Sequence, residues 1–205
     1  MGKLLIVNGS PRAPRSNSKK YIEIFLRYFK EDYEIYNVTE NKHSVIYDKL
    51  KDYSRILFVF PLNADSLPAS LMRFMAGVDS SKILPGTVMG VIINCGFLEP
   101  EQNNAALKIM EIFVNSVGGI WGTRLAIGSG EAILTTPFKF LVVRKIRKFA
   151  KAFKQNKPVC SYVTMPISKK MFLKASTVYW VNYGKKNRIT KKQMDTMVIQ
   201  EISKS

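Results

Sequence analysis

Short apolar runs alternate with helix-like stretches over the first three-quarters of this chain of 205 residues. The runs are rich in Val, Ile, Leu and Phe and end at turn-forming residues, as is typical of strands buried on both faces of a sheet. Five strands are predicted, at residues 3–8, 33–38, 55–60, 87–94 and 120–127. This alternation predicts a mainly parallel α/β sheet with helices on both of its faces.

The segments between the runs repeat apolar residues at helical spacing. Ile22, Phe25, Leu26 and Phe29, for example, keep the i, i+3, i+4, i+7 pattern of a helix with one apolar face. Further helices are predicted at 68–78, 101–117 and 138–153, with a short, poorly formed one at 44–53.

The alternation stops after residue 153. Residues 167–183 are expected to form a helix with Met171, Ala175 and Val178 turned inward, and Gly184 fits its end. Thr190 and Gln193 have the spacing of a capping box that opens a final helix at 191–202. The predicted organisation is one domain over residues 1–155 and a basic helical extension over residues 156–205.

In open parallel sheets of this kind, ligands bind beyond the carboxyl ends of the strands, where the strand order reverses. The loop over residues 9–18 stands at such an end, between the first strand and the first helix. Backbone N–H groups and the helix dipole at such a position favour an anion. The side-chain donors expected to assist are Ser10, Ser16, Asn17 and Ser18, with charge from Arg12 or Arg15. The alternative is an ordinary strand-to-helix turn, because the loop lacks both the Walker A sequence and the dinucleotide-binding glycines.

The order of three loops resembles the NADPH-dependent FMN reductase family of the flavodoxin-like superfamily. Gly9-Ser10-Pro11-Arg12 followed by Ser16-Asn17-Ser18 is similar to that family's FMN phosphate loop. The resemblance covers about residues 3–150 and includes Gly128-Ser129-Gly130-Glu131 at the end of the fifth strand. It implies a flavodoxin-like, doubly wound, five-stranded parallel sheet that binds FMN.

Two further loops carry this resemblance. The second resembles the family loop that borders the isoalloxazine ring, and the third resembles its third flavin loop. The residues that the resemblance implies as flavin contacts in these two loops are Pro61, Leu62, Asn63, Ala64, Asp65, Ser66, Asn94, Cys95, Gly96, Phe97, Glu99 and Gln102.

Asn63 stands where the family commonly has an aromatic residue, which would supply stacking surface against the flavin. Phe97 or Trp121 is a candidate to replace it. Three functions therefore remain open. The first is an FMN-dependent oxidoreductase that passes hydride from NAD(P)H through FMN to a quinone or another flavin. The second is a flavin-binding electron carrier or sensor, and the third is a flavin-free domain that acts through a basic surface.

Catalytic side chains are not expected, because FMN carries the redox chemistry and the protein supplies binding and orientation. Cys95 is interpreted as a small residue that lines a flavin loop, with a nucleophile as the weaker alternative. His43 is the only histidine, and we expect it to be a solvated loop residue. The spacing of the two cysteines and the histidine predicts no metal site.

Positive charge is concentrated at the end of the chain. Residues 1–136 carry 15 basic and 13 acidic residues, whereas residues 137–205 carry 17 basic and 2 acidic ones, which accounts for the net charge of +17. The preferred interpretation of residues 138–153 is a last domain helix with its apolar side on the sheet. An anionic membrane surface or an acidic redox partner is the alternative use of this charge. Nucleic acid is not expected, because no recognised binding motif is present.

The remaining expectations concern location and assembly. A signal peptide and a membrane span are absent from the pattern, and two cysteines fit a reducing compartment, so a cytoplasmic protein is expected. The family resemblance implies a homo-oligomer, with a homodimer as the specific expectation.

Overall fold

The computed structural model describes residues 3–195, and the chain consists of two compact units, Met1–Met165 and Pro166–Ser205. The first unit alternates strands and helices in the predicted order. Its strands are β1 (Lys3–Asn8), β2 (Tyr33–Asn37), β3 (Tyr53–Pro61), β4 (Val88–Asn94), β5 (Ile120–Ile127) and β6 (Cys160–Val163). Its α-helices are α1 (Asn17–Leu26), α2 (His43–Asp48), α3 (Ala69–Ala76), α4 (Asn104–Ser116) and α5 (Lys139–Lys154).

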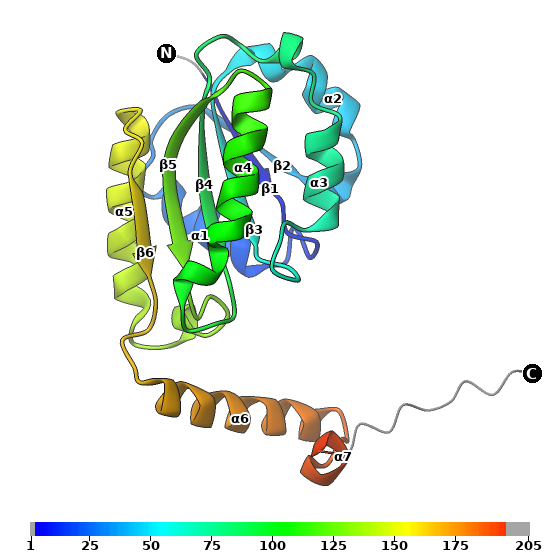
Figure 1. Cartoon of the computed structure of the whole chain (residues 1–205), viewed down its shortest axis with the longest axis vertical. Helices are drawn as coiled ribbons and strands as arrows, with labels where there is room; N and C mark the ends of the chain where they lie inside the picture. Colours follow the sequence, from blue (N-terminus) through cyan, green and yellow to red (C-terminus); the bar gives the residue numbers. More distant parts are fainter. Residues whose placement is uncertain (1–2, 196–205) are drawn as a thin grey trace, which may run out of the picture. The chain divides into compact units, whose positions relative to one another are not determined.

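The strands form one parallel sheet in the order β2-β1-β3-β4-β5-β6 (Figure 1). The order reverses between β1 and β3, so the loops that follow these two strands flank the switch point. Asn8 is paired with Val59, Pro61 with Asn94, and Asn94 with Ile127. The loops that follow β1, β3, β4 and β5 therefore leave the sheet at the same edge.

Both faces of the central strands β1, β3 and β4 are buried, which explains why these strands are continuously apolar rather than alternating. On one face, Leu5, Val7 and Phe58 belong to the core shared with α2, α3 and α4. On the other face, α1 packs with α5. Phe25 of α1 lies at ring-centroid distances of 6.0 and 6.3 Å from Phe149 and Phe153 of α5.

The helix α5 is the last helix of the sheet domain, as the preferred interpretation of residues 138–153 expected. Val142, Ile146, Phe149, Ala150 and Phe153 are buried. Most of its cationic side chains face solvent instead. The apolar face and the positive charge of this segment thus lie on opposite sides of one helix.

The sheet has six strands, and the prediction of five is wrong. β6 has only four residues and pairs in parallel with β5 through Arg124 to Ile127. The crossovers β4–α4–β5 and β5–α5–β6 step in the same direction across the sheet, yet α4 and α5 cover opposite faces. The two crossovers therefore have opposite hands, whereas about 98% of such connections are right-handed. The alternation pattern therefore does not predict a short sixth strand that is reached by a left-handed crossover.

The second unit contains α6 (Lys169–Lys186) and α7 (Lys191–Asp195). The predicted capping box is confirmed, because the Thr190 N–H donates to Gln193 Oε1 at 2.9 Å and the Gln193 N–H donates to Thr190 Oγ1 at 3.3 Å. The rest of the predicted final helix, residues 196–202, lies outside the described residues. α6 continues two residues beyond Gly184.

The predicted inward positions of α6 are wrong. Met171 is 60% exposed and Val178 is 55% exposed, and Gly184 is the buried residue of this helix. Within residues 3–195, none of the helices is both long enough and apolar enough to cross a membrane.

Candidate functional site

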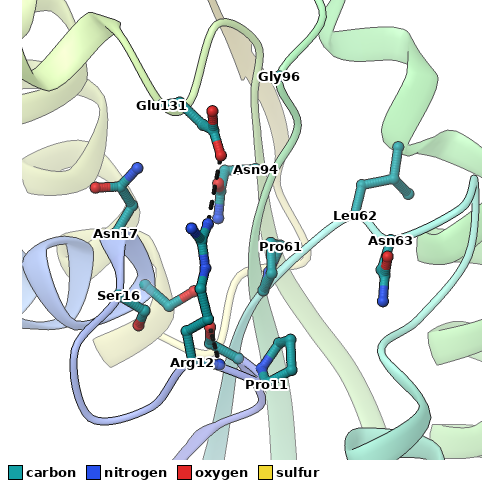
Figure 2. A pocket seen from close by; sticks show the side chains of 12 residues that line it. Pro11, Arg12, Ser16, Asn17, Pro61, Leu62, Asn63, Asn94, Gly96 and Glu131 are labelled. Atoms are coloured by element: carbon teal, nitrogen blue, oxygen red, sulfur yellow. Dashed lines mark hydrogen bonds and ion pairs between the residues drawn. The ribbon is translucent and has the colours of Figure 1, made fainter. Parts of the chain in front are cut away.

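A cavity of about 300 Å³ opens at the carboxyl edge of the sheet, between the loops that follow β1, β3, β4 and β5 (Figure 2). Its walls are polar side chains and prolines from four separate segments of the chain. The lining residues are Ser10, Pro11, Arg12, Ser16, Asn17, Ser18, Pro61, Leu62, Asn63, Asn94, Gly96 and Glu131.

The first loop is held by its own side chains. Asn8 Oδ1 accepts a hydrogen bond from the Ser10 N–H at 3.3 Å, and Ser10 Oγ accepts one from the Arg12 N–H at 3.3 Å. Ser10 is buried, so this arrangement is shielded from water. These bonds fix the chain where it turns from β1 toward the first turn of α1.

The first turn of α1 presents donors to the cavity. Ser16 caps the helix and accepts a hydrogen bond from the Lys19 N–H through its Oγ. The backbone N–H groups of Arg15, Ser16, Asn17 and Ser18 make no hydrogen bond with the described part of the chain. Ser16, Asn17 and Ser18 line the cavity, so these unpaired donors lie beside it at the positive end of the helix dipole. This arrangement is suited to bind an anion.

The loop after β3 is a tight turn over Asn63 to Ser66. The N–H groups of Asn63 and Ser66 each donate to the carbonyl oxygen of the other at 3.0 Å. Ala64 and Asp65 between them have φ of 47° and 56°, values that residues with a side chain seldom adopt. The turn is therefore strained, and it directs Asn63 to the cavity while Ala64, Asp65 and Ser66 stay outside the lining.

The loop after β4 contributes Asn94 and Gly96. Asn94 is buried, and its side-chain amide donates to the Phe60 carbonyl oxygen at 3.2 Å, which ties β4 to β3 at the wall of the cavity. The Leu62 N–H donates to the Asn94 carbonyl oxygen at 2.7 Å. These two bonds join the second and third loops into one wall.

Cys95 is turned away from the cavity. Its Sγ lies 3.3 Å from Asn103 Nδ2. The residue as a whole is 3% exposed. Burial raises the pKa of the thiol, which makes the thiolate scarce and a nucleophilic role unfavourable. Cys95 was interpreted as a small residue that lines a flavin loop, but it is not among the residues that line the cavity.

The loop after β5 closes the cavity from the fourth side. The Tyr21 hydroxyl donates to the Gly130 carbonyl oxygen at 2.7 Å, and Asn17 Nδ2 donates to the same oxygen at 3.4 Å. Glu131 then extends toward the first loop, where its Oε1 lies 3.3 Å from Arg12 Nη2 (Figure 2). The first and last loops are thereby connected through α1 and through this ion pair.

The structure brings together ten of the residues expected to contact a cofactor. These are Ser10, Arg12, Ser16, Asn17, Ser18, Pro61, Leu62, Asn63, Asn94 and Gly96. Outside the lining lie Ala64, Asp65, Ser66, Cys95, Phe97, Glu99 and Gln102. Glu131 lines the cavity but was absent from the predicted set, although its segment Gly128 to Glu131 had been recognised at the end of the fifth strand.

The two aromatic candidates for stacking differ in position. Trp121 is the second residue of β5, at the amino end of that strand, so the length of the strand separates it from the cavity. Its ring instead lies beneath the Arg124 guanidinium at 5.3 Å. Phe97 belongs to the loop after β4, which borders the cavity, and it is 49% exposed. Of the two aromatic residues, it is therefore the better candidate for stacking on a flavin.

His43 lies outside the cavity, and the expectation of a solvated loop residue is wrong in part. It begins α2, and its Nδ1 is hydrogen-bonded to the Tyr36 hydroxyl. Burial lowers the pKa of the imidazole, with a smaller contribution from Arg73. Residues 3–195 contain no group of three or more His, Cys, Asp or Glu side chains that could hold a metal ion.

Several solved structures are similar in fold to this chain. The NAD(P)H:quinone oxidoreductase of Methanothermobacter marburgensis superposes with a TM-score of 0.59 at 12% identity over 75% of this chain and 96% of its own. A flavodoxin of Fusobacterium nucleatum, solved with flavin mononucleotide, gives 0.55 at 16% identity over 76% and 98%. The fold is flavodoxin-like.

A third flavodoxin-like neighbour is the FMN-dependent NADH-azoreductase of Bacillus anthracis, solved in complex with FMN. It superposes with a TM-score of 0.51 at 17% identity over 75% of this chain and 99% of its own. No protein-family model matches the sequence, and a search of curated proteins finds no match. The likeness at these identities is therefore one of fold.

Proposed function

We propose that the cavity binds FMN and that the protein is an FMN-dependent NAD(P)H oxidoreductase. The observation that carries the proposal is the run of four unpaired backbone N–H groups, from Arg15 to Ser18, beside a polar cavity at the switch point of the sheet. Ligands of flavodoxin-like sheets bind at this point. The bound-FMN structures among the neighbours make FMN the first ligand to test.

The phosphate of FMN would be held by the first loop. The N–H groups of Ser16, Asn17 and Ser18 supply directed donors, and the hydroxyls of Ser10 and Ser16 lie in the same wall. Arg12 supplies a positive charge that can form a charge-assisted hydrogen bond to a phosphate oxygen. Because most of these donors belong to a fixed backbone, little conformational entropy is lost when they bind an anion.

The flavin ring would lie toward the second and third loops, where Leu62, Asn63 and Gly96 line the cavity. The Leu62 and Asn63 side chains and the Gly96 backbone offer contact on one side of the flavin, without an aromatic ring to stack on it. A ring held in this way keeps one face accessible to a nicotinamide. We therefore expect FMN to bind reversibly and to exchange with solvent.

FMN supplies the redox chemistry when bound, taking up hydride from NAD(P)H and giving electrons to an acceptor. The residues of this chain bind FMN and orient it. The donors of α1 fix the phosphate, and the strained turn at Asn63 sets how far the second loop reaches over the cavity. A small quinone, an azo compound or a second flavin is the proposed acceptor, in keeping with the quinone oxidoreductase and the azoreductase among the structural neighbours.

The absorption spectrum of the purified protein reconstituted with FMN tests this proposal, followed by anaerobic titration with NADPH and NADH. We expect a perturbed flavin spectrum and its bleaching by one of the two nucleotides. A flavin spectrum that neither nucleotide bleaches would support the second candidate, an electron carrier, which the replacement of the aromatic by Asn63 favours. The absence of any FMN binding would refute both.

Assembly and location belong to the same proposal. Our working description is a homodimer in the cytoplasm. The FMN-binding domain extends beyond the expected boundary at residue 155 to include β6, and the extension begins at Pro166.

A further inference from the structure

The helix α6 leaves large apolar side chains in solvent. It spans 18 residues, of which Gly184 is the buried one. Met171, Leu173, Val178 and Trp180 are 60%, 55%, 55% and 48% exposed. Met171 and Val178 lie on one side of the helix and Leu173 and Trp180 on the other, so apolar side chains are exposed around the helix rather than on one face. Large exposed apolar surface marks an interaction site.

Three aromatic rings gather on this helix. Tyr179 and Trp180 lie 5.2 Å apart between ring centroids, and Trp180 and Tyr183 lie 5.9 Å apart. Phe172, Tyr179 and Tyr183 follow each other at intervals of seven and four residues, which places them on one side of a helix. Trp and Tyr combine an apolar body with a polar tip and are enriched where apolar and aqueous phases meet.

Positive charge flanks the aromatic cluster. Residues 166–195 contain eight Lys or Arg residues and a single acidic one, Asp195, whereas residues 175–184 carry no charge. Lys170 stands in the first turn of α6, where the helix dipole disfavours a cation. An anionic partner would offset this unfavourable interaction.

We propose that α6 docks on the surface of an anionic lipid bilayer, with the cluster Tyr179, Trp180 and Tyr183 in the interface and the flanking lysines on lipid phosphates. Lys and Arg near such a surface attract anionic headgroups, and exposed apolar side chains gain by leaving water. The helix does not meet the length and hydropathy needed to span a membrane, so it would lie on the surface.

Charge decides between this partner and the alternatives. A second copy of α6 would bring two strongly cationic helices together, and their repulsion opposes self-association. Nucleic acid would engage the lysines but would leave Met171, Leu173 and Val178 in water. A bilayer with anionic headgroups offers both a negative surface and an apolar phase. This inference is independent of FMN binding, since none of its residues lines the cavity.

Tryptophan fluorescence of the full-length chain reports on the helix directly. The chain has two tryptophans, so the substitution Trp121→Phe leaves Trp180 as the only emitter. We expect its emission to shift to shorter wavelength when vesicles of phosphatidylcholine with about 30% phosphatidylglycerol are added, and to be quenched by brominated lipid. The matched variant Trp180→Phe, which keeps Trp121, should show neither change.

Co-sedimentation with the same vesicles measures affinity. The triple variant Tyr179→Ser, Trp180→Ser and Tyr183→Ser should lower the partition coefficient at least ten-fold. The matched control changes three exposed apolar residues of the first unit, Tyr33→Ser, Val45→Ser and Ile112→Ser, and should bind as the wild type does. Replacing Lys170, Lys174 and Lys185 by Gln should also lower binding at least ten-fold, because each removed cation weakens the attraction to the anionic surface.

Several outcomes would overturn the proposal. Equal binding to pure phosphatidylcholine vesicles would remove the role of charge, and equal loss in the control variant would remove the role of α6. A Trp180 emission already at short wavelength without lipid, together with a dimeric mass, would show that a second copy covers the helix. Displacement from vesicles by a short polyuridine that itself blue-shifts Trp180 would indicate nucleic acid instead.

Discussion

The Arg12 guanidinium lies 3.3 Å from the Glu131 carboxylate and joins the loop after β1 to the loop after β5 across the cavity. Both side chains are largely exposed, so the pair contributes little to folding, at most about 1 kcal/mol. Its importance lies in its position. A phosphate in the first loop would compete with Glu131 for Arg12 and would lie close to the carboxylate.

Removal of this carboxylate is expected to strengthen FMN binding. The substitution Glu131→Gln should raise the affinity about five-fold at low salt, because it abolishes a repulsion of about 1 kcal/mol between like charges. Arg12→Gln should lower it about ten-fold or more, since hydrogen bonds to charged groups contribute about 1.5–3 kcal/mol. Quenching of flavin fluorescence measures both. Arg27→Gln, at the carboxyl end of α1 and outside the cavity lining, is the control, and an equal loss there would point to a general charge effect.

Gly130 allows the last loop to approach Asn94. A Cβ at Gly130 would lie 2.7 Å from Asn94 Cβ and 3.1 Å from the Cys95 carbonyl oxygen, so Gly130→Ala should lower the free energy of unfolding by about 1–3 kcal/mol. It should also weaken FMN binding. Gly96→Ala is the matched control, because a Cβ there meets no atom within 4 Å and should change stability by less than about 0.5 kcal/mol. Urea unfolding distinguishes the two, and similar losses in both variants would contradict the packing described for Gly130.

Asn63 is the residue at which a gain of binding is expected. Asn63→Tyr adds an aromatic ring on the side of the cavity where the flavin ring is proposed to lie, and stacking contributes about 0.5–1.5 kcal/mol. The affinity for FMN should rise about two-fold to ten-fold, with slower release. Stopped-flow fluorescence measures the release rate. Unchanged binding of FMN by a folded Asn63→Tyr variant would show that the ring does not lie against this loop.

The pKa of Glu34 determines how the free energy of unfolding is expected to depend on pH. Hydrogen bonds from Lys3 and Tyr53 lower the pKa of Glu34 to about 2, and they join β1, β2 and β3 at the end of the sheet opposite the cavity. Because the pKa is lower in the folded chain than in the unfolded chain, this stabilisation is present above about pH 4.3 and is lost as the pH falls toward 2.

The substitution Glu34→Gln should therefore flatten the loss of unfolding free energy between about pH 5 and pH 3. Urea unfolding at several pH values measures it. The exposed Glu23→Gln serves as the control and should keep the wild-type slope. An unchanged slope in Glu34→Gln would show that the three-residue contact does not titrate as described.

The sequence predicted the parts of the fold that depend on local pattern. The five longer strands, the helices between them and the capping box at Thr190 all follow from periodicity or from short-range hydrogen-bonding chemistry. β6 did not, because a four-residue edge strand such as Cys160–Val163 has too little apolar pattern to be distinguished from a loop.

The location of the site could be predicted where the path of the backbone determines it. The first loop converges on the cavity because it joins a strand to a helix, and a parallel sheet places the ends of its strands together. Side-chain direction within the other loops was not predictable. The turn at Ala64 and Asp65 requires positive φ values that the sequence does not announce with glycine, and the orientation of Cys95 depends on contacts such as the one with Asn103.

The sequence pattern also did not predict that the apolar side chains of α6 are exposed. Met171 and Val178 are apolar residues at helical spacing, so they were expected to be inward positions, yet they are exposed. Composition indicates that such side chains need a partner but does not identify it.

The most direct test of the central claim compares FMN with riboflavin, which lacks the phosphate. The unpaired N–H groups from Arg15 to Ser18 should make FMN bind at least about a hundred-fold more tightly, since several charge-assisted hydrogen bonds of about 1.5–3 kcal/mol each are lost with riboflavin. Isothermal titration calorimetry of the purified full-length protein with both flavins measures this ratio. Equal affinities, or no binding of FMN, would contradict the assignment of the cavity as a flavin phosphate site.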